Sequence, residues 1–154
     1  MTRLASDLFK LVVRYSPLVS IDLVVRNERR QMLLGLRRNR PAQDYWFVPG
    51  SRVAKEEKIG DAFVRITRDE LGTPFPRERA RLIGVFEHLY PDNFSGDPTF
   101  GTHYVVLAHE LQVAEEALAL PDAQHSGYRW ASDAEILADE EVHENTKAYA
   151  RLLR

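Results

Sequence analysis

A chain of 154 residues fits one domain, and we expect a single domain over residues 1–154. With 44% hydrophobic and 29% charged residues it can bury a core and stay soluble, and its formal net charge of −2 offers no general surface for a polyanion. The absence of cysteine excludes disulfides, thiol catalysis and cysteine-ligated metals, and it fits a reducing cytoplasm. Charges within residues 1–11 argue against a signal peptide or a membrane span, and no basic-aromatic patch indicates nucleic-acid binding.

The first third of the chain predicts a helix followed by short strands. Apolar residues at helical spacing over residues 4–16 predict a helix that Pro17 stops, with Ser6 or Asp7 as its cap. Three strand-like runs follow, at residues 18–25, 32–36 and 46–48. Pro49-Gly50 then closes the last of these runs in a turn.

The remainder mixes helices and strands with short connections. A helix is expected over residues 58–71, ending at Gly72 as its C-terminal cap. Two longer strands are expected at residues 81–90 and 103–113, joined by a polar loop over 91–101. A short strand and two helical stretches complete the chain, at residues 128–130, 132–139 and 145–153. This order predicts one α/β or α+β domain without identifying a particular fold.

The central helix contains one unusual residue. Ile59, Ala62, Phe63 and Ile66 fall on one apolar face, and Glu70 lies in the middle of that face. An unpaired buried carboxylate is costly, and it normally finds a cation or takes up a proton. The simpler alternative is that Glu70, in the last turn, turns out to solvent or meets an arginine.

The segment before that helix, together with the helix, resembles the Nudix box, G-x5-E-x7-R-E-U-x-E-E-x-G-U with U a bulky apolar residue. Read from Ser51, the matching residues are Glu57, Arg65, Glu70 and Gly72. The departures are Ser51 for the first glycine, Ile66 and Asp69 for two glutamates, and Thr67 and Thr73 at the two apolar positions. The turn glycine permits a tight bend, and exposed carbonyls there suit a hard cation.

The reduced box is similar to that of one Nudix subfamily, the GDP-mannose mannosyl hydrolases. The stretches that also resemble this subfamily lie at residues 17–22, 39–43, 45–50, 92–96, 102–106 and 120–125, so the likeness covers about residues 15 to 150. The resemblance implies the Nudix fold, a mixed β-sheet sandwiched between α-helices. It implies hydrolysis of GDP-mannose, or a related GDP-hexose such as GDP-glucose, to GDP and free sugar by water attack at sugar C1 with inversion.

The resemblance also implies a metal and a base. One Mg²⁺ per subunit, with Mn²⁺ as a second candidate, would be held by the Gly50 carbonyl, the Glu70 carboxylate and the Gln124 side-chain oxygen. His125 is the family's candidate general base, a task that suits imidazole. Without the family match, a histidine in this polar loop would be read as a solvated residue.

The resemblance also implies that two arginines and an aspartate contact the substrate. Arg37 and Arg52 resemble the pair that stabilises the departing diphosphate, although a solvated surface position is the usual fate of an arginine. Asp22 interrupts an apolar strand, and the resemblance implies contact with the sugar hydroxyls. The alternative for Asp22 is an ordinary aspartate at a strand edge or end.

Four further residues are implied by the same resemblance. His88 and Tyr104 would contact substrate, and their alternatives are a plain strand histidine and a core tyrosine. Phe9 and Tyr90 would pack near the guanine, although aromatic residues more often belong to the core. Other histidines lack the His-x3-His spacing of a zinc site.

Three questions stay open at this stage. The resemblance implies a homodimer and places Glu57 and Arg65 as braces of loop and helix. If the loop needs a positive φ at Ser51, serine would strain it and shift the Gly50 carbonyl. Alternatives to the glycosidase are a Nudix pyrophosphatase releasing GMP and sugar 1-phosphate, and a non-catalytic nucleotide-binding module.

Overall fold

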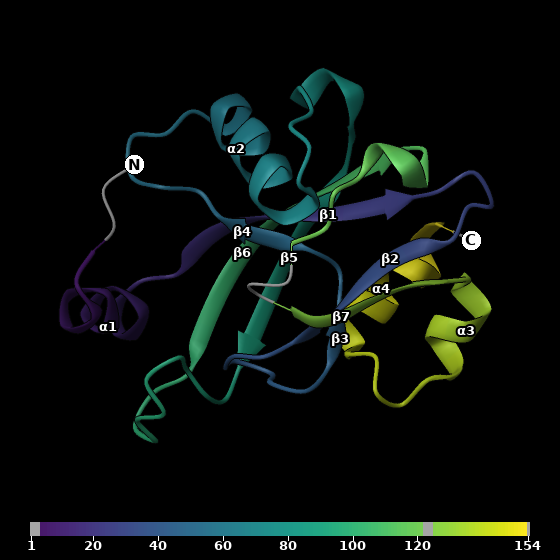
Figure 1. Ribbon diagram of the computed structural model, residues 1–154. Helices are drawn as coiled ribbons and strands as arrows, with labels where there is room; N and C mark the ends of the chain where they lie inside the picture. Colours follow the sequence, from purple (N-terminus) through teal and green to yellow (C-terminus); the bar gives the residue numbers. More distant parts are fainter. Residues whose placement is uncertain (1–3, 122–124, 154) are drawn as a thin grey trace.

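A mixed β-sheet forms the centre of the computed structural model, which describes residues 4–121 and 125–153, with only the backbone of residues 125 and 126 (Figure 1). The helices are α1 (Ser6–Tyr15), α2 (Ile59–Leu71), α3 (Asp133–Ala138) and α4 (Glu144–Leu153), with 3-10 turns at Arg77–Arg79 and Glu115–Ala117. The strands are β1 (Leu18–Arg26), β2 (Met32–Arg37), β3 (Trp46–Phe47), β4 (Gly50–Arg52), β5 (Arg81–Tyr90), β6 (Thr102–Gln112) and β7 (His125–Ala131). The sheet order is β3-β2-β1-β6-β5, with β4 paired to β1 and β7 paired to β2, and β1 runs parallel to β6.

Most of the expected elements are present within a few residues of their predicted bounds. Two details differ. Ala5 occupies the N-cap position of α1 without a side-chain hydrogen bond, so the predicted capping by Ser6 or Asp7 is wrong. Residues 50–52 form strand β4 against β1, because long-range pairing extends a segment that local sequence predicts only as a turn.

The two faces of strand β1 pack against two different layers of the core. Its side chains alternate, so Ile21, Leu23 and Val25 pack with α2, whereas Val24 packs with α3 and α4. By the same alternation Asp22 points to the side of α4, at the level where the apolar pattern of β1 is interrupted.

Helix α2 buries the face that the sequence predicts, except at its start. Ala62, Phe63 and Ile66 are fully buried, whereas Ile59, the first residue of the helix, is 37% exposed. Gly72 ends the helix in the left-handed conformation with φ 72°, as expected for a C-terminal cap. A Cβ there would lie 1.8 Å from the carbonyl oxygen of Ala119, so this close approach requires glycine.

Part of the sheet surface and of α1 is apolar and exposed. On β5, Val85 and Leu89 are 62% and 67% exposed, and Val19 on β1 is 43% exposed. Exposed apolar residues in and just before α1 follow a helical spacing and are Leu4, Leu8, Leu11 and Tyr15. Within the described ranges, no helix has both the length and the apolar composition needed to cross a membrane.

Candidate active site

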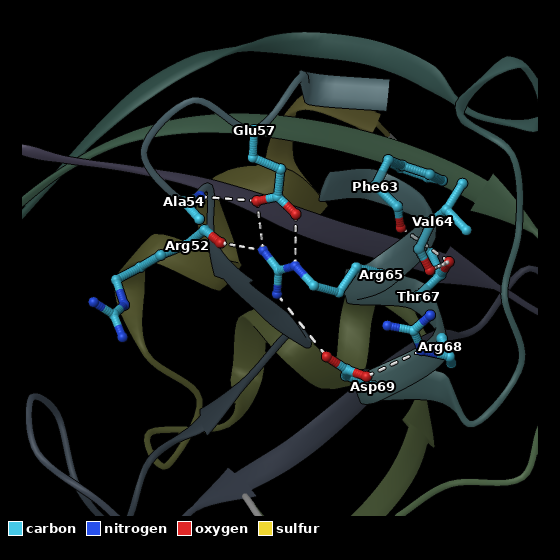
Figure 2. Close-up of polar contacts among 9 residues, drawn as sticks. All are labelled: Arg52, Ala54, Glu57, Phe63, Val64, Arg65, Thr67, Arg68 and Asp69. Carbon is cyan, nitrogen blue, oxygen red and sulfur yellow. Dashed lines mark hydrogen bonds and ion pairs between the residues drawn. The ribbon is translucent and has the colours of Figure 1, made fainter. Parts of the chain in front are cut away.

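The loop that leads into α2 is clamped to the helix by Glu57 and Arg65 (Figure 2). Arg65 Nε and Nη2 donate to the two carboxylate oxygens of Glu57 over 2.7 and 2.9 Å, and both side chains are 15% exposed. Arg65 Nη2 also donates to the carbonyl oxygen of Arg52 over 2.8 Å, and the Ala54 amide donates to Glu57 over 2.8 Å. The hydrogen bonds from Arg65 lower the pKa of Glu57. The pair therefore braces loop and helix, as the sequence predicts.

The side chain of Arg52 takes no part in this clamp. Figure 2 shows the Arg52 guanidinium directed away from Glu57 and Arg65, while the backbone of Arg52 is held by them. That guanidinium lies 3.9 Å from the ring centroid of Phe9 on α1. Ser51 lies in β4 opposite Ile21 and is not among the described residues with positive φ, so the predicted strain at this position is absent.

Gly50 approaches the middle of β1, opposite Asp22. The Leu23 amide donates to the Pro49 carbonyl over 2.8 Å, which makes Asp22 and Gly50 a non-hydrogen-bonded pair, the closer of the two antiparallel pairings. A Cβ at position 50 would lie 2.6 Å from Ile21 O and 2.7 Å from Asp22 Oδ1, so this position requires glycine. In such a pair the Gly50 carbonyl points away from β1 and takes no part in the ladder with it.

Glu70 brings a carboxylate to the same region from the last turn of α2. Its side chain is 3% exposed, so the alternative in which it turns out to solvent is wrong. Its negative charge is one cause of the raised pKa of Asp22, so the two carboxylates lie within electrostatic range of each other.

The donors in this region fit a hard divalent cation. The Gly50 carbonyl and the Glu70 carboxylate are oxygen ligands, which Mg²⁺ prefers. The third predicted ligand, Gln124, lies outside the described residues. In the part of the chain with described side chains, no group of three or more His, Cys, Asp or Glu is arranged to hold a metal ion.

Asp22 lies at the centre of a buried polar cluster on the α4 side of the sheet. Tyr149 on α4 donates its hydroxyl proton to Asp22 Oδ2 over 2.7 Å, and the Tyr149 oxygen lies 3.5 Å from His88 Nε2. Burial raises the pKa of Asp22 to about 6, against the lowering effects of the Tyr149 hydrogen bond and the Arg37 charge. Burial lowers the pKa of His88 to about 4, so this imidazole is neutral at pH 7.

Tyr104 and Arg37 adjoin this cluster from neighbouring strands. Tyr104 pairs with His88 between β6 and β5, and burial raises its pKa while Arg37 and Arg52 both act to lower it. Arg37 lies 5.6 Å from the ring centroid of Phe47, and its buried Nε has no hydrogen-bond partner among the described residues. The structure therefore brings Asp22, Arg37, His88, Tyr104 and, through its charge, Arg52 into one region.

The two predicted guanine-packing residues are separated into different aromatic groups. Phe9 lies 4.8 Å from Phe94 in the loop after β5. Tyr90 lies 6.3 Å from Tyr104 and 6.4 Å from Phe47, measured between ring centroids. Of His125 only the backbone is described, and it pairs with Arg37 between β7 and β2. That pairing places the backbone of residue 125 beside Arg37.

Sequence reasoning missed three residues that lie in α4 or directly before it. Besides Tyr149, His143 stacks on Phe47 with centroids 4.6 Å apart, and Asn145 Nδ2 donates to the Tyr90 hydroxyl over 3.1 Å. The backbone N–H of Asn145 donates to His143 Nδ1 over 3.1 Å. Because Nδ1 accepts this bond, the neutral ring carries its proton on Nε2 and caps the start of the helix. The local signal was a pair of polar residues, Asn145 at the start of the predicted helix and His143 two residues before it.

A helix packed on the middle of a mixed sheet, with the loop before it clamped to the helix and oxygen donors at Gly50 and Glu70, is typical of the Nudix class of fold. The NUDIX domain model matches residues 16–152, and the chain belongs to the Nudix family. It is a Nudix hydrolase by this membership, and such enzymes act on nucleoside diphosphate derivatives with divalent metals such as Mg²⁺ or Mn²⁺.

Three relatives illustrate the likeness. The chain is 40% identical over 125 residues to the low-salt glycan biosynthesis protein Agl8 of Haloferax volcanii, covering 81% of this chain and 77% of that protein. A MutT NUDIX hydrolase of Burkholderia pseudomallei superposes with a TM-score of 0.72 at 21% identity, over 90% of this chain and 99% of that chain. A bifunctional NMN adenylyltransferase/ADP-ribose pyrophosphatase of Francisella tularensis, complexed with AMP and a Mn ion, gives a TM-score of 0.67 at 18% identity, over 96% of this chain and 44% of that chain.

Proposed function

We propose that the protein hydrolyses GDP-mannose, or a related GDP-hexose, to GDP and the free sugar by water attack at sugar C1 with inversion. The observation that carries this proposal is the placement of the box acids. The last three glutamate positions of the box fall at residues 66, 69 and 70, and only Glu70 is a buried carboxylate. Ile66 belongs to the core, and the Asp69 side chain is 52% exposed beside Arg65 and Arg68 (Figure 2). A site with one box carboxylate suits charge neutralisation of a leaving diphosphate better than activation of water by clustered metals.

The arginines suit the leaving group in this proposal. The charges of Arg37 and Arg52 both act to lower the pKa of Tyr104, so both guanidinium groups lie within electrostatic range of that residue. The buried Nε of Arg37 lacks a hydrogen-bond partner in the described part of the chain, and a phosphate oxygen would supply one. As the C1–O bond breaks, the electron pair passes to the β-phosphate oxygen of GDP, where two guanidinium groups stabilise it.

The opposite side of the site suits the sugar and the attacking water. Asp22, His88 and Tyr104 offer an acceptor, a neutral imidazole and a hydroxyl, which match the donors and acceptors of hexose hydroxyls. His125 is the proposed base that removes the proton from water as its oxygen bonds to C1. A bound Mg²⁺ ion, held by Gly50, Glu70 and Gln124, would neutralise diphosphate charge.

The relatives and the surface support further parts of the proposal. The name of the Haloferax volcanii protein, which refers to glycan biosynthesis, supports a sugar nucleotide as substrate. The exposed apolar residues of α1, β5 and β1 support a homodimer, since a second copy would remove them from water. A cytoplasmic location, which the absence of cysteine fits, completes the proposal.

The test is product analysis in ¹⁸O-labelled water. With Mg²⁺ we expect GDP and singly labelled mannose from GDP-mannose, by mass spectrometry. Glu70→Gln and His125→Gln should each abolish most turnover, whereas the control Asp69→Asn, a change at the exposed box position, should retain it. GMP with mannose 1-phosphate would instead establish attack at phosphorus and overturn the proposal.

A further inference from the structure

Tyr149 is a fully buried residue of α4 with one polar atom directed at the site. Its ring packs edge-on against Phe86 of β5, with centroids 5.0 Å apart and planes at 88°. The hydroxyl at the far end of the ring lies between Asp22 of β1 and His88 of β5. Helix α4 therefore places a hydroxyl donor within a cluster otherwise built by strands.

The contacts of Asp22 assign different directions to its two carboxylate oxygens. Oδ2 accepts the Tyr149 hydroxyl proton over 2.7 Å. Oδ1 faces the other way, toward Gly50 of β4, because a Cβ on Gly50 would lie 2.7 Å from it. The Tyr149 hydroxyl uses its one hydrogen in the bond to Asp22, so toward His88 Nε2 its oxygen can act only as an acceptor. That contact is long, at 3.5 Å.

An aspartate carboxylate does not hold such an orientation by itself. Its terminal torsion is broad, so rotation of the carboxylate meets little intrinsic resistance. The positive charge of Arg37 lies within electrostatic range and attracts the same group. A fixed donor on one oxygen is therefore what keeps the other oxygen directed toward Gly50.

We infer that Tyr149 is a positioning residue for substrate recognition, fixing Asp22 so that Oδ1 faces the hydroxyl groups of the hexose. This inference rests on the proposed sugar-nucleotide substrate. It assigns to α4 a role in recognising the sugar, which the loop and helix of the Nudix box do not supply. Because Tyr149 acts through Asp22, its removal should weaken a ligand that carries the hexose and leave a ligand without the hexose, such as GDP, unaffected.

The experiment compares binding of GDP-mannose and GDP by calorimetry, with Ca²⁺ in place of Mg²⁺ and chromatography of the recovered nucleotide to verify that none is cleaved. The variants are Tyr149→Phe, Asp22→Ala and the double variant. We expect Tyr149→Phe to weaken GDP-mannose about tenfold, the value of one hydrogen bond to a charged group, and to leave GDP within about twofold. In the double variant the effect of Tyr149→Phe should disappear, because no carboxylate remains to be positioned.

A stability control separates positioning from general loosening. Ser132→Ala removes the capping box of α3, which lies outside the site, and should lower the stability of the protein modestly. This variant should bind both ligands as the wild type does. Equal weakening of GDP and GDP-mannose by Tyr149→Phe, unchanged GDP-mannose binding, or additive effects in the double variant would each overturn the inference. The reaction itself is judged from wild-type products alone, so GMP release would refute the proposed function while the ratio between variants still tests Tyr149.

Discussion

Replacing Asp22 with Asn, or His88 with Gln, should expose two opposite pH dependences of stability that nearly cancel in the wild-type protein. Burial raises the pKa of Asp22 from 3.8 to about 6 and lowers the pKa of His88 from 6.5 to about 4. The two groups share Tyr149 as a neighbour, so they experience the same interior environment.

The signs follow from proton uptake. As the pH falls through 6, folded Asp22 takes up a proton that the unfolded chain does not bind until 3.8, so acidification stabilises the fold through this group. As the pH falls through 6.5, unfolded His88 takes up a proton that the folded protein refuses until about 4, so acidification destabilises it. Over the full range each contribution is about 3 kcal/mol, and between pH 7 and pH 5 they are about 1 kcal/mol for Asp22 and about 2 kcal/mol for His88.

The assay is urea denaturation of four proteins between pH 7 and pH 5 in metal-free buffer, because a bound cation near Gly50 would add its own charge. Relative to the Asp22→Asn/His88→Gln double variant, Asp22→Asn should lose about 2 kcal/mol on acidification and His88→Gln should gain about 1 kcal/mol. The wild type should stay within about 1 kcal/mol of the double variant. Slopes of the same sign in the two single variants would refute the reasoning.

Three further predictions concern the loop and α2. Gly50→Ala should cost about 1–3 kcal/mol, because its Cβ would meet Ile21 O at 2.6 Å, whereas Gly60→Ala, with nothing within 4 Å, should stabilise by about 0.5–1 kcal/mol in denaturant titrations. Arg65→Lys loses the two-pronged bond to Glu57, and thermal unfolding should show a loss of about 1–2 kcal/mol; an unchanged midpoint would contradict the brace. Ser51→Gly should leave Mn²⁺ affinity within about twofold in a fluorescence titration, since residue 51 is extended; a tenfold gain would revive the idea of strain.

The local pattern of the sequence is sufficient for the elements and for the unusual position of Glu70. Helical spacing predicts the buried face of α2, and glycine after the last apolar residue predicts its end, because both depend on neighbours within one or two turns. The same reasoning fails at residues 50–52, where β4 forms only through pairing with β1, some 30 residues earlier in the chain.

The site itself depends on the resemblance for its residue roles and on tertiary structure for its neighbours. Asp22 is visible in the sequence as a polar interruption of an apolar strand, but its partner Tyr149 reads as one more core aromatic of a helix. Nothing local relates two residues 127 positions apart. The alternation of β1 sends Asp22 to the α4 side, and the packing of α4 on that face then brings the hydroxyl to it.

The sequence by itself thus determined most of the helices and strands and the position of Glu70 on the apolar face of α2, because these follow from periodicity, whereas the brace of Glu57 and Arg65 was implied by the resemblance to the Nudix box. The tertiary structure alone decided that Gly50 must be glycine, that Asp22 and His88 lie around one tyrosine hydroxyl, and that His143 and Asn145 reach the aromatic edge of the site. The physical reason is that strand register and helix packing bring together groups that are far apart along the chain, and the desolvation they share sets the pKa values of those groups.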